Sequence, residues 1–251
     1  MPPQVAYYNA VLVTRRTFLA TAATSYVVSG FSRTRVVRLK ADTTFQDTIA
    51  PGRHPLKLGD DRDGFLYVPP QYSDKPLPLL VVLHGAGNTS LSVQYALPLA
   101  DELGILVLAP DSRDERTWDG VLRDWGPDVD FISAALRQTV TRVRVDRARI
   151  GIGGFSDGAS YALSFGITYG DEFSRVIAMS PGVMQPIGAR GKPRIFISHG
   201  TSDAVMPIDV TSRRFVPRLK ALGYDVTYRE YDGRHSPSPP IVREAFQWFL
   251  Q

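Results

Sequence analysis

The sequence has no cysteine among its 251 residues. Disulfide bonds, thiolate metal sites and a cysteine nucleophile are therefore excluded. Histidine is also scarce, and its four positions are His54, His84, His199 and His235. A histidine-based zinc site would need most of them, and no two have the spacing that puts two ligands on one helical face. We therefore expect neither a metal nor a cofactor.

The chain also lacks an apolar run long enough to cross a bilayer, and it has no internal repeat. Its composition, 43% hydrophobic and 22% charged, suits a globular domain with one sizeable core. The net charge is +4, but the basic residues are scattered and do not interleave with stacking aromatics. We expect a small-molecule partner, no nucleic acid and no stable membrane insertion, and no pattern indicates an oligomeric state.

The N-terminal segment resembles a twin-arginine export signal. Arg15 and Arg16 precede a weakly apolar stretch of small residues at positions 20–30. The segment before the arginine pair has no basic residue, and no Ala-x-Ala cleavage site is evident. An ordinary N-terminal extension is therefore the alternative interpretation. We interpret residues 1–35 as one of these two, which makes the protein exported or cytoplasmic, and residues 36–251 as a single catalytic domain.

Short apolar runs alternate with helical patterns from about residue 64 onward. The run at 79–83 is almost continuously apolar, as expected of a strand covered on both faces. The strand candidates are 64–68, 79–83, 105–109, 149–153, 176–179, 195–198 and 225–231. Apolar residues at helical spacing occupy 132–143, 215–222 and 241–249. This alternation predicts an α/β fold with a mostly parallel central sheet and helices on both faces.

The sharpest local feature is the pentapeptide Gly-Phe-Ser-Asp-Gly at 154–158. It follows the strand candidate at 149–153 directly and opens a segment rich in small residues, which is the context that a G-x-S-x-G nucleophile elbow requires. Glycines are needed on both sides of the serine because a Cβ there would collide with neighbouring backbone. We therefore predict that Ser156 is a nucleophile.

A serine hydroxyl needs a base that removes its proton, and in this motif order the base comes last. His235 lies between the last strand candidate and the last helical pattern, where such a base is expected. His84 and His199 are weaker candidates because each precedes a glycine at a strand end and is more plausible as a backbone-shaping residue. An exposed loop histidine is the alternative interpretation of His235.

The acid that orients this histidine should follow the strand candidate at 195–198. Asp203 lies there, in the sequence His-Gly-Thr-Ser-Asp that follows the strand. Asp209 and Asp225 are rivals that are better explained as a helix start and a turn residue. Asp232 is the strongest competitor because it adjoins the histidine loop.

A tetrahedral intermediate also needs two backbone donors. One should be the N–H of Asp157, directly after the nucleophile, and the other should come from the glycine-rich loop after the strand at 79–83. Ala86 is our choice in that loop, and Gly87 is the alternative. The Asp157 carboxylate would be unfavourable beside an oxyanion, so we expect it to point away, into a salt bridge or solvent.

Four motifs in this order carry a family resemblance: His-Gly-Ala-Gly at 84–87, the pentapeptide at 154–158, His-Gly-Thr-Ser-Asp at 199–203, and His235. Together they resemble the phospholipase/carboxylesterase branch of the α/β-hydrolases, which includes acyl-protein thioesterase-like enzymes and is similar to polyhydroxybutyrate-depolymerase-type and feruloyl esterases. The resemblance spans roughly residues 60–251. It implies the α/β-hydrolase fold and a Ser-Asp-His triad.

In this resemblance the triad is Ser156, Asp203 and His235, and the oxyanion donors are Ala86 and Asp157. Asp157 stands where the thioesterases usually carry glutamine, which argues against a thioesterase. The resemblance and the motifs together predict a carboxylic ester hydrolase that works through an acyl-enzyme on short- to medium-chain esters. The alternatives are a thioesterase, a polyester depolymerase or feruloyl-type esterase, and a catalytically silent binding protein on the same fold.

Two loops bear on substrate access. Only about fifteen residues separate the strand candidates at 176–179 and 195–198, which suits a short connection without a large cap domain. The loop at 111–127 is the longest remaining one and contains Trp118 and Trp125. We expect this loop to form a pocket wall, with Trp118 as a candidate substrate contact, and packing against the domain surface is the alternative for both tryptophans.

Overall fold

The computed structural model of the chain describes residues 49–73, 75–121 and 124–251. The N-terminal segment interpreted above as a signal or an extension lies outside these residues. Eight strands form one sheet in the order β1-β2-β4-β3-β5-β6-β7-β8. The strands are β1 (Gly52–Pro55), β2 (Gly64–Val68), β3 (Leu77–Leu83), β4 (Leu106–Pro110), β5 (Val145–Phe155), β6 (Arg175–Met179), β7 (Arg194–Gly200) and β8 (Val226–Tyr231).

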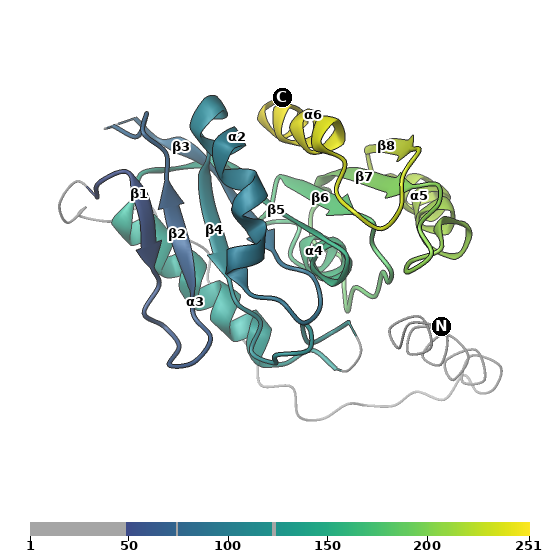
Figure 1. The fold of residues 1–251 in the computed structure, drawn as a ribbon, viewed down its shortest axis with the longest axis horizontal. Helices are drawn as coiled ribbons and strands as arrows, with labels where there is room; N and C mark the ends of the chain where they lie inside the picture. The colour runs from purple at the N-terminus through teal and green to yellow at the C-terminus, as the bar shows by residue number, and fades with distance from the viewer. Residues whose placement is uncertain (1–48, 74, 122–123) are drawn as a thin grey trace.

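The sheet is parallel from β4 through β8, and β2 pairs antiparallel with both of its neighbours, β1 and β4. Strands β3 and β5 lie at the centre, as Figure 1 shows. Because parallel strands present their carboxyl ends at one edge, the loops after β3, β5, β7 and β8 meet there. These loops carry the predicted site residues.

Helices cover both faces of the sheet, and a separate hydrophobic cluster lies on each face. Along β3, Leu79, Val81 and Leu83 belong to one buried cluster, whereas Leu80 and Val82 belong to the other. This alternation follows from the period of two in a strand. The helical segments are η1 (Ser90–Ala96), α2 (Leu97–Leu103), α3 (Pro127–Arg142), α4 (Asp157–Thr168), η2 (Ile208–Val210), α5 (Ser212–Ala221) and α6 (Pro239–Leu250).

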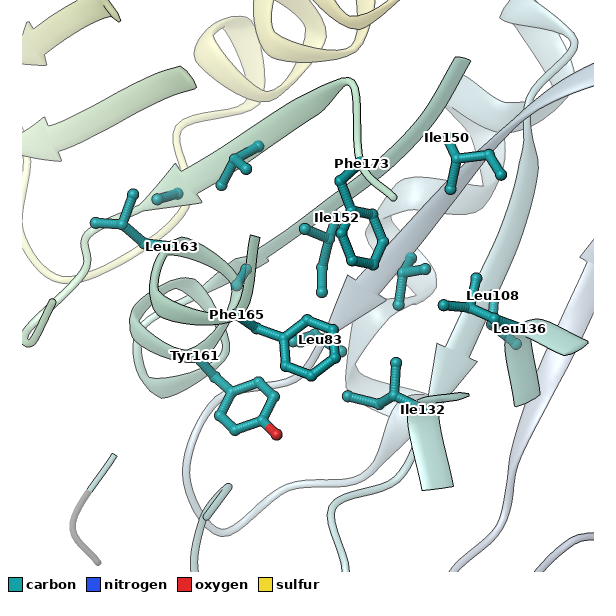
Figure 2. Close-up of a cluster of buried hydrophobic side chains, with 14 of the residues drawn as sticks. Leu83, Leu108, Ile132, Leu136, Ile150, Ile152, Tyr161, Leu163, Phe165 and Phe173 are labelled. Carbon is teal, nitrogen blue, oxygen red and sulfur yellow. The ribbon is translucent and has the colours of Figure 1, made fainter. Parts of the chain in front are cut away.

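Helices α3 and α4 pack on the first cluster. Figure 2 shows Ile132 of α3 and the rings of Tyr161 and Phe165 of α4 around Leu83 and Ile152 of the central strands. The second cluster takes its helical side chains from η1, α2 and α6. The predicted fold class, a mostly parallel sheet with helices on both faces, is therefore confirmed.

The connection between β6 and β7 is short and is fastened to α4 by hydroxyl groups. Ser160 Oγ accepts hydrogen bonds from the N–H groups of Gly182 (2.8 Å) and Val183 (3.2 Å). One turn further along α4, Ser164 Oγ accepts the N–H of Gln185 at 2.9 Å. Among the described residues this connection holds no cap domain, as predicted.

The elements also differ in places from those predicted. β1 and the η1–α2 segment were not predicted, because their short and mixed patterns lack a clear period. Within the described part of the chain, no helix combines the length and the hydrophobicity that a bilayer crossing requires.

Candidate active site

Ser156 lies at the sharp turn between β5 and α4. Its φ of 60° is a strained, left-handed value, and its N–H donates to the carbonyl of Met179 at 2.9 Å. A Cβ on Gly158 would lie 2.3 Å from the carbonyl oxygen of Leu83, and one on Gly154 would lie 2.6 Å from the same atom. Only glycine fits at these two positions, so the turn has the form predicted for an elbow.

His235 lies in the loop between β8 and α6, and its two ring nitrogens connect two other predicted residues. Nε2 lies 2.8 Å from Ser156 Oγ, and Nδ1 lies 2.6 Å from Oδ2 of Asp203. The ring of Phe155 packs against the imidazole with 4.7 Å between ring centroids. The structure thus brings the three predicted side chains into one hydrogen-bonded row.

Asp203 follows β7 and is held on both carboxylate oxygens. Its Oδ1 accepts the N–H groups of Val205 (2.9 Å) and Met206 (2.8 Å), while Oδ2 lies against His235. Burial raises the pKa of Asp203, but hydrogen bonds from His199, His235 and the Met206 N–H outweigh it and hold the pKa well below its usual range. The carboxylate therefore stays ionised.

The rival acids lie elsewhere. Asp232 is exposed, and the His235 imidazole bonds to Asp203 instead. Asp209 pairs with Arg213, and Asp225 pairs with Arg194.

The other histidines are also engaged away from Ser156. His84 Nε2 accepts the N–H of Ser112 at 3.1 Å, and burial lowers the pKa of His84 to about 4. His199 is fully buried behind Asp203, and His54 is hydrogen-bonded to the carbonyl of Ala50. His84 thus contacts backbone at Ser112, whereas His199 contacts the Met206 carbonyl and the side chains of Asp203 and Ser212.

The two predicted oxyanion donors flank Ser156. Asp157 is the first residue of α4, so its N–H has no partner within the helix. Ala86 lines the same cavity as Ser156, and a Cβ built on the preceding Gly85 would lie 3.5 Å from Ser156 Cβ. The N–H of Gly87 donates to the carbonyl of Arg116 at 2.7 Å. Gly87 is therefore already engaged, which favours Ala86.

The side chain of Asp157 is not in a salt bridge or in solvent, and that expectation is wrong. The residue is 1% exposed, and its Oδ2 accepts a hydrogen bond of 2.5 Å from Thr117 Oγ1. Its Oδ1 is buried and has no hydrogen-bond partner among the described residues. Burial raises the pKa of Asp157 to about 7, so a large fraction of the carboxyl is uncharged at neutral pH.

The expectation for Trp118 is also corrected. Trp118 is fully buried, does not line the cavity beside Ser156, and donates Nε1–H to the carbonyl of His84 at 2.8 Å. Its ring packs between His84 and Tyr161, with centroid distances of 4.7 and 5.4 Å. The loop after β4 therefore supports the loop after β3 and does not line the cavity at Ser156.

The cavity at Ser156 and His235 has a volume of about 930 Å³. Its walls come from η1, α2 and the start of α6, and the apolar wall residues include Val93, Leu99, Pro237, Pro240 and Val242. None of these wall residues was predicted from the sequence. The run of prolines after His235 was the one visible signal, and it also fits an ordinary helix start.

The arrangement supplies the parts that acyl transfer needs: a hydroxyl, a base in contact with it, an acid behind the base, amide donors and an apolar cavity. In the described residues, no group of three or more histidine, aspartate or glutamate side chains is placed to hold a metal ion.

Comparisons with known proteins identify the family to which this chain is similar. The profile of the Phospholipase/Carboxylesterase family matches residues 126–250. The "Probable feruloyl esterase C" of Aspergillus flavus is 28% identical over 174 residues, which is 65% of this chain and 62% of that protein. The "Acyl-protein thioesterase 1" of Gibberella zeae is 26% identical over 112 residues, 41% of this chain and 47% of that protein.

The chain thus spans about 62% of the length of the Aspergillus flavus relative. Among solved structures, esterase PE8 superimposes with a TM-score of 0.64 at 21% identity, covering 75% of this chain and 98% of that one. That likeness concerns the fold, and the profile match concerns the half of the chain that carries Ser156, Asp203 and His235. The chain belongs to the phospholipase/carboxylesterase family of the α/β-hydrolase superfamily.

Proposed function

We propose that this protein is a serine carboxylesterase that hydrolyses esters through an acyl-enzyme on Ser156. His235 removes the proton from the Ser156 hydroxyl during attack and returns it to the leaving alcohol. Asp203 keeps the Nδ1–H tautomer of His235 and stabilises the imidazolium that forms. The amides of Ala86 and Asp157 stabilise the negative charge on the tetrahedral intermediate.

One observation carries this proposal. Ser156 Oγ, His235 and Asp203 form a continuous row at 2.8 and 2.6 Å, although they come from three loops that are distant in the sequence. Buried polar groups in a binding protein would need no such order of hydroxyl, imidazole and carboxylate. The strained φ of Ser156, which holds its hydroxyl at the cavity, supports the same conclusion.

The cavity supports a substrate with a short- to medium-length or aromatic acyl group. Its walls are largely apolar, so they favour hydrocarbon over charged groups. A volume of about 930 Å³ exceeds what an acetyl group fills. The relative from Aspergillus flavus is named as a feruloyl esterase, which makes aromatic acyl esters the first substrates to try.

A thioesterase is the second candidate, because one relative is named as an acyl-protein thioesterase. The same acyl-enzyme would serve thioesters, so the two activities differ in the leaving group. The glutamine that follows the nucleophile in thioesterases is replaced here by Asp157. This replacement favours the oxygen ester. A polyester depolymerase and a silent binding protein are the remaining alternatives.

A fluorophosphonate probe and p-nitrophenyl esters test the proposal. We expect the probe to add its mass at Ser156, and we expect turnover of p-nitrophenyl acetate that Ser156→Ala abolishes without changing the far-UV circular dichroism. Ser160→Ala, one turn further along α4, is the matched control and should keep the label. A folded wild-type protein that takes no label would favour the silent binding protein. Comparing methyl ferulate with acyl thioesters then separates the first two candidates.

A further inference from the structure

Asp203 lies between two imidazoles, of which the proposed mechanism uses only one. On the side opposite His235, the fully buried His199 places Nε2 3.3 Å from Oδ2 of Asp203. His199 comes from the end of β7, four residues before the acid. The two histidines therefore approach the same carboxylate oxygen from different elements.

The contacts of His199 settle which nitrogen carries its proton. Nε2 faces the carbonyl of Met206 at 2.7 Å as well as the Asp203 carboxylate. Both are acceptors only, so Nε2 must carry a hydrogen. On the other side of the ring, Nδ1 lies 2.7 Å from the hydroxyl of Ser212, which can donate to it.

Ser212 is itself fixed, because it is fully buried at the first residue of α5. A row of five side chains results: Ser212, His199, Asp203, His235 and Ser156, joined at 2.7, 3.3, 2.6 and 2.8 Å. Two backbone amides hold the Oδ1 atom of Asp203. The position of Oδ2 is limited by His235 and, on its other contact, by His199.

We propose that His199 is a positioning residue: its Nε2–H, which donates to the Met206 carbonyl at 2.7 Å and also faces Oδ2 of Asp203 at 3.3 Å, holds the Asp203 carboxylate against His235, and Ser212 fixes the tautomer in which it does so. The proposal rests on the proposed esterase function. His199 touches no substrate, since it does not line the cavity at Ser156. Its effect reaches the reaction through the orientation and charge of Asp203.

Two substitutions of His199 distinguish a role as hydrogen-bond donor from a role that only fills space. His199→Gln can place an amide N–H where Nε2 lies, whereas His199→Leu fills the volume without a donor. We expect His199→Leu to lower kcat for p-nitrophenyl acetate by about tenfold with KM unchanged, and His199→Gln to restore most of the loss. His54→Gln, at a half-buried histidine in β1, the strand at the edge of the sheet, is the matched control.

Proton NMR supplies a readout that a purely structural role would not move. The His235 Nδ1–H, held against Asp203 at 2.6 Å, should give a resonance far downfield. We expect this resonance to shift or broaden in His199→Leu and to return in His199→Gln. Ser212→Ala should lower kcat a few-fold in the wild-type background and have no effect in His199→Leu, because the two residues act through one contact.

The outcomes are distinguishable from those of the proposed function. If the wild-type protein hydrolyses no ester and Ser156 takes no fluorophosphonate, the esterase proposal fails. If the wild type is active and Ser156→Ala is not, but folded His199→Leu keeps the wild-type kcat and the His235 resonance, only this inference is overturned. The inference would also be overturned if His199→Gln and His199→Leu lowered kcat equally while the His235 Nδ1–H resonance stayed unchanged.

Discussion

The hydroxyl of Thr117 donates a hydrogen bond of 2.5 Å to the carboxyl of Asp157, the residue that follows the proposed nucleophile, across 40 positions of sequence. The other carboxyl oxygen of Asp157 is buried and unpaired among the described residues. Burial removes the water that would stabilise a negative charge on this carboxyl, and it raises the pKa of Asp157 to about 7.

Replacing Asp157 by asparagine should change how stability depends on pH. The pKa of Asp157 in the folded protein, about 7, lies above that of an unfolded aspartate, so the folded state binds the proton more tightly. The free energy of unfolding should therefore fall as pH rises from about 4 to about 7, and this group should account for a loss of about 3 kcal/mol between pH 5 and pH 8. Asp157→Asn keeps an acceptor for Thr117 and should lose that contribution.

Urea unfolding at both pH values measures this contribution as a difference between variant and wild type. Asp119, whose pKa burial raises to about 6, acts in the same direction and stays in both proteins. The comparison therefore isolates Asp157. An identical pH dependence in the two proteins would contradict the assignment of a neutral carboxyl at this position.

Removing the acid of the proposed triad should slow turnover far more than removing its neighbour in the histidine loop. Asp203→Asn leaves His235 without its anionic partner, and we expect kcat to fall by roughly a thousandfold or more. Asp232→Asn, at an exposed carboxylate, should leave kcat within about twofold. Steady-state hydrolysis of p-nitrophenyl acetate checks both, and a reversed order would show that the acid is misassigned.

Trp118→Phe should lower both stability and kcat without changing KM. The change removes the only N–H that Trp118 can offer and leaves the buried carbonyl of His84 without this donor, at a cost of about 1–3 kcal/mol. The loop after β3 then holds Ala86 less firmly, and we expect kcat to fall about tenfold.

Trp125→Phe is the control for this experiment. Trp125 stacks on the same aromatic cluster at Tyr161 and Phe165 but packs away from the loop after β3. It should cost stability while keeping kcat. Should Trp118→Phe raise KM and leave kcat intact, Trp118 would be a substrate contact after all.

Narrowing the cavity should change the preference for acyl length. Ser92 is exposed, lies in η1 and lines the cavity, so Ser92→Trp fills space without disturbing the core. We expect kcat/KM for p-nitrophenyl octanoate to fall about tenfold relative to the acetate. Leu91→Trp, at the neighbouring residue that is 54% exposed and outside the cavity wall, should leave the ratio unchanged. Equal ratios in both variants would place the acyl chain elsewhere.

The sheet and the row of three side chains could be predicted from the sequence because local rules govern them. The apolar run of β3 is explained by a strand that is covered on both faces. The glycines beside Ser156 are explained by a turn that has no room for a Cβ. Asp203 and His235 could then be placed by their positions after β7 and β8, since parallel strands end at one edge.

The cavity walls and the roles of Trp118 and Asp157 could not be predicted, because they depend on contacts between distant segments. Nothing near Trp118 in the sequence indicates that its N–H meets the carbonyl of His84, 34 positions away. An aspartate after a nucleophile is expected in solvent, and only the packing of the loop after β4 buries Asp157.

The hydroxyls of Ser160 and Ser164 also bear on the kinetics of the whole cycle. Both anchor the connection between β6 and β7 to α4, and Thr168 does the same one turn later by accepting the N–H of Ile187 at 3.2 Å. A segment fastened at three successive turns has no hinge on which to swing. Substrate entry and alcohol release should therefore proceed by simple diffusion, and a chemical step should be rate-limiting.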